Sequence, residues 1–142
     1  MPHKSRISWL GKMAFDAELN GHHFTIDATD TVGGENKGPR PKGLILTAIA
    51  GCTGMDVVSI LKKMKVTDYT LDIDVSGELT TVHPIVYHTI SVEFKFEGEN
   101  LPADKLQKAV ELSETRYCGV SAMMRKAVKM NTIIYINNEV LK

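Results

Sequence analysis

The chain has 142 residues, 17 basic and 17 acidic side chains, and 43% hydrophobic residues. This length and composition are typical of a single globular domain that folds without structural metals or disulfide bonds. The balanced charge argues against nucleic-acid binding and against electrostatic attraction to an anionic membrane.

The first 27 residues predict a small antiparallel sheet. We expect no signal peptide, because the N-terminal residues are largely polar. Apolar and polar residues alternate from Met13 to Leu19, and the alternation resumes from His22 to Ile26. Asn20-Gly21 lies between these runs and is a strong two-residue hairpin signal. The pattern predicts a β-meander over about residues 6–27.

Residues 28–40 form a loop rich in Gly, Asp, Thr and Pro. The segment Gly33–Gly38 lacks the spacing of a phosphate-binding loop or a dinucleotide-binding turn. One interpretation is a flexible connector. The other is a loop that brings Glu35 or Arg40 to the thiol region, and the sequence leaves both open.

Residues 41–64 predict one long helix that organises the chain. Pro41 suits a first helical turn, and Lys62 and Lys63 suit the last. Apolar residues point in nearly all directions, which predicts a helix covered by protein on most sides. Gly51 and Gly54 are costly inside a helix and predict the close approach of another backbone. The apolar runs are interrupted by Lys, Asp or Gly before a membrane-spanning length, so we expect a cytoplasmic protein that contacts no membrane.

The rest of the chain predicts two paired strands, further helices and a closing strand. Alternation within residues 69–97 indicates an antiparallel pair, residues 102–127 indicate helices interrupted near Cys118, and residues 132–136 indicate a last strand. This order is not a regular βα alternation. It predicts a single α+β domain over residues 1–142, with mainly antiparallel sheet.

Cys52 and Cys118 are the two cysteines, and their wide separation excludes a CxxC redox motif or a zinc knuckle. Cys118 is expected at a helix start, which favours a thiolate. Cys52 is expected in mid-helix, where burial and Asp56, one turn later, disfavour one. Two inert core cysteines are an alternative interpretation. The histidines show no metal-ligand spacing, so neither a metal nor a cofactor is expected.

Two segments resemble motifs of a known family. The sequence PKGLILTAIAGCTGMDV, residues Pro41–Val57, resembles the central-helix motif of the OsmC/Ohr family, the osmotically inducible protein C and organic hydroperoxide resistance proteins. SETRYCGV, residues Ser113–Val120, resembles the second cysteine motif. The resemblance covers nearly the whole chain. It implies an OsmC-like fold, in which sheets wrap around two central helices that carry the cysteines, in an intertwined homodimer.

The resemblance also implies a thiol peroxidase that reduces organic hydroperoxides or hydrogen peroxide. By position, Cys52 is the peroxidatic thiol, which becomes a sulfenic acid, and Cys118 is the resolving thiol, which closes a disulfide. An external dithiol such as a lipoyl protein then reduces this disulfide. Helix-terminus electrostatics, in contrast, favour Cys118 as the more ionised sulfur.

The chain departs from the family pattern at one position. Lys42 lies where the peroxidase branches carry a carboxylate that holds an arginine against the thiolate. Arg40, Lys42 and Arg116 are therefore the candidate thiolate-stabilising cations, and Glu35 is a candidate substitute carboxylate. The alternative function is a non-peroxidase dimer that senses redox state or binds a small ligand.

Overall fold

The computed structural model describes residues 2–141, which form two compact units that meet at the Ile45–Leu46 boundary. Each unit is described below by itself. The single domain expected over residues 1–142 stays a prediction.

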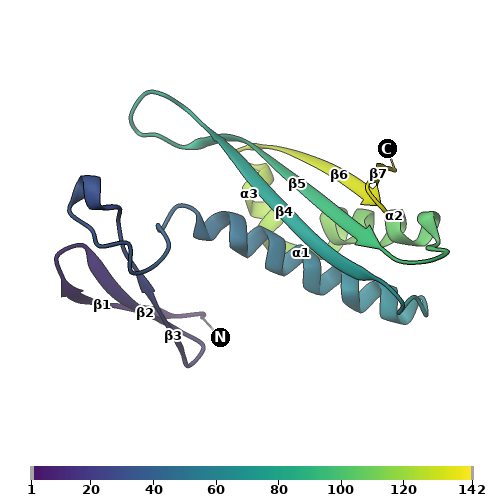
Figure 1. The fold of residues 1–142 in the computed structure, drawn as a ribbon, viewed down its shortest axis with the longest axis horizontal. Coiled ribbons are helices and arrows are strands. Elements are labelled where there is room, and N and C mark those ends of the chain that lie inside the picture. The colour runs from purple at the N-terminus through teal and green to yellow at the C-terminus, as the bar shows by residue number, and fades with distance from the viewer. Residues whose placement is uncertain (1, 142) are drawn as a thin grey trace. The chain divides into compact units, whose positions relative to one another are not determined.

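The first unit contains the predicted β-meander. Strands β1 (Ser5–Gly11), β2 (Ala14–Leu19) and β3 (His22–Ile26) form an antiparallel sheet in the order β1-β2-β3 (Figure 1). Asn20 and Gly21 join β2 to β3 with φ angles of 52° and 80°. Positive φ at both central residues is the signature of the two-residue hairpin that the sequence predicted.

The loop after β3 folds around the carboxylate of Asp27. This carboxylate accepts backbone N–H groups from Ala28 at 2.7 Å, and from Glu35 and Lys37 at 3.1 Å each. These hydrogen bonds, with that of Ala28 first, lower the pKa of Asp27. A short 3-10 turn, η1 (Asp30–Val32), lies within the loop. The segment is therefore an ordered turn system rather than the flexible connector that composition suggested.

Helix α1 (Leu44–Lys63) belongs almost wholly to the second unit and begins three residues later than predicted. Its buried side chains lie at intervals of four residues, because such positions share one helix face. They are Ile49, Thr53, Val57 and Leu61. Outside this stripe Met55 is 77% exposed, so the chain by itself covers one face of α1 and not most sides.

Among the described residues, α1 is also the helix whose length and apolar composition would suffice to cross a membrane. We predicted that Lys, Asp and Gly interrupt the apolar runs before they reach a membrane-spanning length. Judged by the length and composition of α1 alone, that prediction was wrong. Core helices meet the same criterion, and the buried stripe of α1 belongs to the hydrophobic core of the second unit.

The two glycines of α1 differ in their surroundings. A Cβ at Gly54 would lie 2.9 Å from Cδ1 of Ile73, whereas a Cβ at Gly51 would meet nothing within 4 Å. The predicted approach of another backbone was therefore wrong at Gly54 and stays a prediction at Gly51. Gly54 makes room for a side chain of the sheet, and Gly51 faces open space in the chain alone.

The second sheet has the order β4-β5-β6-β7. Strands β4 (Thr70–Leu79) and β5 (Tyr87–Glu97) are antiparallel, as predicted. Strand β6 (Lys129–Ile136) begins earlier than predicted and runs parallel to β5, and β7 (Glu139–Val140) closes the sheet. The parallel pair exists because the helical segment between β5 and β6 is a crossover connection.

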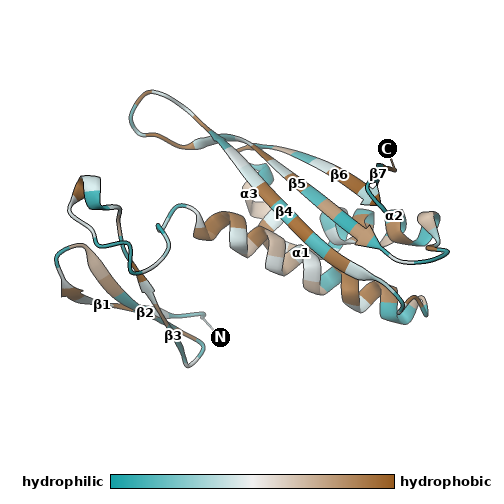
Figure 2. Ribbon diagram, in the orientation of Figure 1, coloured by the Kyte–Doolittle hydropathy of each residue, from teal (hydrophilic) through white to brown (hydrophobic). Residues whose placement is uncertain are grey.

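This crossover consists of α2 (Ala103–Leu112), a π-helical turn η2 (Ser113–Tyr117) and α3 (Gly119–Arg125). Hydrophobic and polar residues alternate along β5, and the sheet lies beside the helices (Figures 1 and 2). The buried side chains of β5 belong to one core cluster with those of α1 and α2. The buried residues of β5 are Ile90, Val92, Phe94 and Phe96. The α+β class that the sequence predicted is confirmed.

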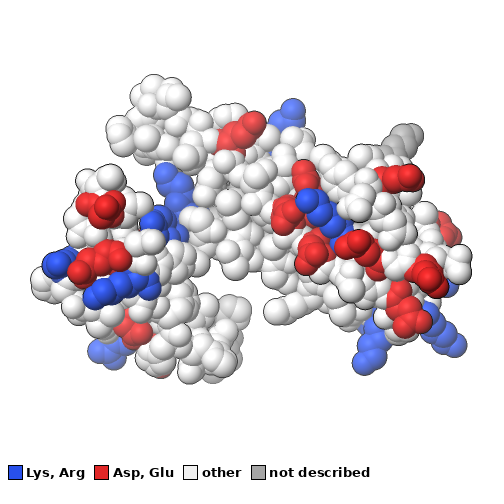
Figure 3. Space-filling view, viewed as in Figure 1, with Lys and Arg blue, Asp and Glu red and all other residues white. Residues whose placement is uncertain are grey.

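The opposite face of the β4–β5 pair is charged. The ammonium of Lys95 lies 2.7 Å from the carboxylate of Asp74 and 3.6 Å from that of Glu93. Figure 3 shows acidic and basic side chains mixed over this face. Such exposed pairs contribute little stability, and they keep this side of the sheet polar.

Candidate active site

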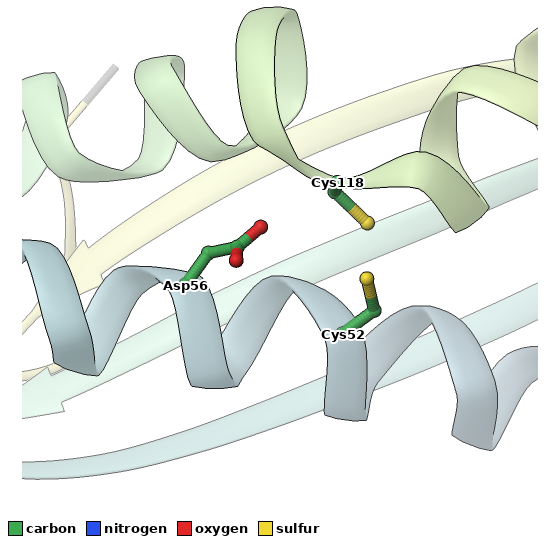
Figure 4. Close-up of side chains that lie close together, drawn as sticks. All are labelled: Cys52, Asp56 and Cys118. Atoms are coloured by element: carbon green, nitrogen blue, oxygen red, sulfur yellow. The ribbon is translucent and has the colours of Figure 1, made fainter.

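The second unit brings the two cysteines together from distant parts of the chain. Sγ of Cys52, Sγ of Cys118 and a carboxylate oxygen of Asp56 all lie within 4.8 Å of one another. Figure 4 shows the two sulfurs pointing toward each other, with the Asp56 carboxylate beside them. We call these three side chains the dithiol–carboxylate cluster.

Helix α1 provides two members of the cluster. Cys52 and Asp56 are four residues apart, so their side chains lie one above the other on one helix face. Both side chains are half-buried, and they lie on the same side of the stripe residue Thr53. A helix anchored by that stripe therefore fixes the spacing of the thiol and the carboxylate.

The junction between η2 and α3 provides Cys118. The π-helical turn ends with the Cys118 N–H donating to the Ser113 carbonyl at 2.7 Å. Cys118 has extended backbone angles (φ −76°, ψ 103°) and is the N-cap of α3, where its Sγ accepts the Ser121 N–H at 3.3 Å. The expectation that Cys118 lies at a helix start is confirmed. The predicted interruption of the helical segment near Cys118 is confirmed as well, because the π turn ends just before it.

Ser113 holds the carboxylate of the cluster. Its Oγ donates to Oδ2 of Asp56 at 3.1 Å, and its side chain is fully buried. Ser113 was not among the predicted site residues. One sequence signal could have pointed to it. Ser113 occupies a core position in the helical pattern of residues 102–127, and a buried hydroxyl needs a hydrogen-bonding partner.

The electrostatics of the cluster disfavour a thiolate at Cys52. Burial raises the pKa of Cys52 most, and the hydrogen bond with Cys118 and the negative charges of Cys118 and Asp56 raise it further. A hydrogen bond from the Val120 N–H acts in the opposite direction. Among the described residues, the charged groups that shift this pKa are therefore acidic.

Arg116, one of the candidate cations, lies in η2 two residues before Cys118. Its guanidinium carbon is 5.7 Å from the centre of the Tyr117 ring, and both residues are exposed. This is the geometry of a surface cation–π contact. The role of Arg116 at the sulfurs stays a prediction.

The other three candidates, Glu35, Arg40 and Lys42, belong to the first unit. The Glu35 carboxylate pairs with the Lys37 ammonium at 3.1 Å, and the Arg40 Nη1 donates to the Gly38 carbonyl at 2.8 Å. Nearby lysines lower the pKa of Glu35. Each of the three roles at the sulfurs stays a prediction.

A small cavity of about 10 Å³ lies beside the site, lined among others by Thr53, Glu114, Ser121 and Arg125. It has room for about one water molecule. Burial raises the pKa of Glu114, and the Arg125 guanidinium donates to the Glu114 carbonyl. This cavity is too small for a drug-sized organic ligand.

The chain is similar in sequence to known proteins of one family. The family model described as OsmC-like protein matches residues 34–133. The chain is 30% identical to Protein YhfA of Escherichia coli K12 over 128 residues, which are 89% of this chain and 92% of that protein.

Solved structures give the same result for the fold. A hypothetical protein from Aquifex aeolicus VF5 superposes with a TM-score of 0.82 at 24% identity, covering 96% of this chain and 97% of the other. The organic hydroperoxide resistance protein OhrB of Bacillus subtilis superposes with a TM-score of 0.63 at 17% identity, covering 96% and 98%. At these identities the likeness shows the fold alone.

Proposed function

Because the chain belongs to the OsmC-like family, we propose that it is a thiol-dependent peroxidase that reduces organic hydroperoxides or hydrogen peroxide. The observation that supports this proposal is the convergence of Cys52 and Cys118, whose sulfurs lie within 4.8 Å of each other although they are distant in sequence. Two free thiols at this separation can be oxidised to a disulfide and reduced again by thiol–disulfide exchange.

The proposed reaction has two steps in the protein. The Cys52 sulfur attacks the distal peroxide oxygen, so that an S–O bond forms, the O–O bond breaks, and the thiol proton accompanies the departing alkoxide to give an alcohol or water. The Cys118 sulfur then attacks the sulfenic acid, so that an S–S bond forms and water leaves. One peroxide is thereby reduced by two electrons, and the two thiols become one disulfide.

An external dithiol, for example a lipoyl protein, completes the proposed cycle. It attacks the Cys52–Cys118 disulfide through a mixed disulfide, becomes oxidised itself, and returns both thiols. The cycle requires no bound cofactor. It does require a reducing compartment, which is why we place the protein in the cytoplasm.

The exposure of the two sulfurs supports Cys52 as the first to react. Cys52 is half-buried, whereas Cys118 is 2% exposed and has its sulfur bonded to the Ser121 N–H. A peroxide that approaches from solvent therefore meets Cys52 first. Accessibility and the family resemblance agree here, against the helix-terminus argument for Cys118.

We also propose that the protein is a homodimer. Met55 and Val58 on α1 are 77% and 48% exposed, and Tyr117 and Met123 beside the second cysteine are 56% and 65% exposed. Large exposed apolar side chains that lie close together are typical of a surface that a second copy covers. A solution mass twice that of the chain would support this assembly, and a monomeric mass would overturn it.

The decisive experiment measures consumption of cumene hydroperoxide and hydrogen peroxide with dithiothreitol or dihydrolipoamide as reductant. The wild-type protein is expected to consume peroxide catalytically. Cys52→Ser is expected to have a rate at least about 100-fold lower, because removal of the nucleophile has such effects in other covalent mechanisms. Asp104→Asn, which alters an exposed helix residue, serves as the control. A Cys52→Ser variant with the wild-type rate would refute the proposal.

One observation favours a second candidate function. The raised pKa of Cys52 and its acidic neighbours slow thiolate chemistry at neutral pH. A dimer that senses redox state or binds a small ligand, without turning over peroxide, would tolerate such a thiol. Formation of the disulfide by stoichiometric peroxide without any turnover with dithiols would favour the sensor over the enzyme.

A further inference from the structure

We propose that the reduced dithiol–carboxylate cluster binds one borderline-soft divalent cation, of which Zn²⁺ is the type, through the two sulfurs and an Asp56 oxygen. This goes beyond the proposed peroxide chemistry. It requires only that Cys52 and Cys118 be reduced, and it holds whether or not the protein turns over peroxide.

The donor set selects the class of metal. Thiolates are soft ligands that favour Zn²⁺ and other late transition metals, whereas Mg²⁺ and Ca²⁺ take oxygen donors. Two sulfurs and one carboxylate oxygen are three of the four ligands of a tetrahedral zinc ion. The fully reduced and deprotonated cluster carries three negative charges, and a divalent cation balances most of them.

The geometry requires little rearrangement. In a tetrahedral zinc site with Zn–S bonds of about 2.3 Å and Zn–O bonds of about 2.0 Å, the donor atoms are about 3.5–3.8 Å apart. The three donor atoms here already lie within 4.8 Å of one another. Small changes in the side-chain torsions of Cys52, Asp56 and Cys118, which face one another in Figure 4, would bring the three donor atoms to these separations.

Hydrogen bonds that orient the three donors are already in place. Ser113 Oγ donates to Oδ2 of Asp56 at 3.1 Å, which leaves the other carboxylate oxygen for a metal. The Ser121 N–H donates to the Cys118 sulfur at 3.3 Å, and the Val120 N–H donates to the Cys52 sulfur. Outer hydrogen bonds of this kind fix ligand orientation and compensate thiolate charge in metal sites.

The site is also accessible. Cys52 and Asp56 are half-buried in the chain, so two of the three donors are partly exposed, while Cys118 is buried. Three protein ligands leave one position for water or another small ligand, which is the arrangement of an open rather than a purely structural zinc site.

The test uses the full chain, reduced and kept free of oxygen, with Co²⁺ as the spectroscopic probe and Zn²⁺ as the competitor. We expect one Co²⁺ per chain, intense visible bands of tetrahedral Co²⁺, and a near-ultraviolet band from thiolate-to-cobalt charge transfer. One equivalent of Zn²⁺ should abolish these bands. Oxidation of the two thiols to a disulfide should do the same.

Variants assign the three ligands. Cys52→Ser, Cys118→Ser and Asp56→Asn are each expected to weaken Co²⁺ and Zn²⁺ binding at least about 10-fold, since even loss of an outer-shell partner costs about 10–100-fold in metal affinity. Asp56→Asn is nearly isosteric and keeps an oxygen for the Ser113 hydroxyl, so it should fold normally. Asp104→Asn is the matched control and should bind metal as the wild type does.

The proposal is overturned if the reduced wild-type protein does not bind Co²⁺, if binding gives no thiolate charge-transfer band, or if Asp56→Asn binds with unchanged affinity. The peroxidase assay is run separately in excess EDTA. Peroxide turnover without metal binding would therefore remove this inference alone, and metal binding without turnover would remove the peroxidase proposal alone.

Discussion

The segments that carry the two cysteines differ in almost every local property. Cys52 lies in mid-helix, half-buried, with Asp56 one turn away. Cys118 lies at the N-cap of α3, nearly fully buried, after a π-helical turn. The sulfur at the helix start is thus the less accessible of the two. Accessibility favours Cys52 as the first sulfur to react, whereas a position at a helix start favours Cys118, and trapping of the first oxidation product separates the two.

The largest effect expected from this contrast concerns the location of the first oxidation. In Cys118→Ser, one equivalent of peroxide should leave a sulfenic acid on Cys52 that dimedone traps almost completely, because no second thiol resolves it. In Cys52→Ser, trapping on the buried Cys118 should be at least about 10-fold lower, since reactivity follows exposure as well as ionisation. Mass spectrometry locates the adduct, and a dominant adduct on Cys118 would reverse the two roles.

Asp56→Asn tests the electrostatic side of the contrast. Removal of the carboxylate charge should lower the pKa of Cys52, so the midpoint of its alkylation profile moves to lower pH. At pH 7 the iodoacetamide rate of Cys52 should rise roughly two- to tenfold, because the repulsion is partly screened at this half-exposed position. The same substitution should weaken zinc binding, so one change moves two readouts in opposite directions. An unchanged alkylation rate would show that the Asp56 charge does not contribute to the raised pKa of Cys52.

Ser113→Ala tests the hydrogen bond that links the two segments. The variant loses the donor to Asp56, and we expect the free energy of unfolding to fall by about 1–3 kcal/mol, as for buried hydrogen bonds to charged groups. Urea unfolding with an unchanged slope measures this loss. Ser59→Ala on the exposed side of α1 should stay within about 0.5 kcal/mol. Equal stability of the two variants would mean that the bond does not couple the segments.

The smallest effect concerns the glycines on either side of Cys52. Gly51→Ala should raise the free energy of unfolding by about 0.5–1 kcal/mol, because alanine is the better helix former and its Cβ meets no neighbour. Gly54→Ala should lose this gain, because its Cβ would lie 2.9 Å from Cδ1 of Ile73. Thermal and urea unfolding of both variants measure the difference. Destabilisation by Gly51→Ala would place a partner against this turn of α1.

Much of the fold follows from local sequence patterns. The Asn20-Gly21 hairpin, the alternation along β5 and the long apolar run of α1 each specify their element, because side-chain period and turn chemistry act within a few residues. The π-helical turn after α2 had no such signal. Nor did the parallel pairing of β6 with β5, which depends on the path of a crossover rather than on the composition of either strand.

The sequence by itself determined that the chain carries two cysteines in two motifs and that Cys52 and Asp56 share a helix face, since four residues make about one helical turn. Only the tertiary structure decided that Cys118 faces them and that Ser113 bonds the carboxylate. The spacing of Cys52 and Cys118 along the chain excluded every local metal or redox motif. A three-residue cluster assembled across the core has no linear signature, because its distances are set by how α1 and the η2–α3 junction pack, and not by how far apart their residues lie in the chain.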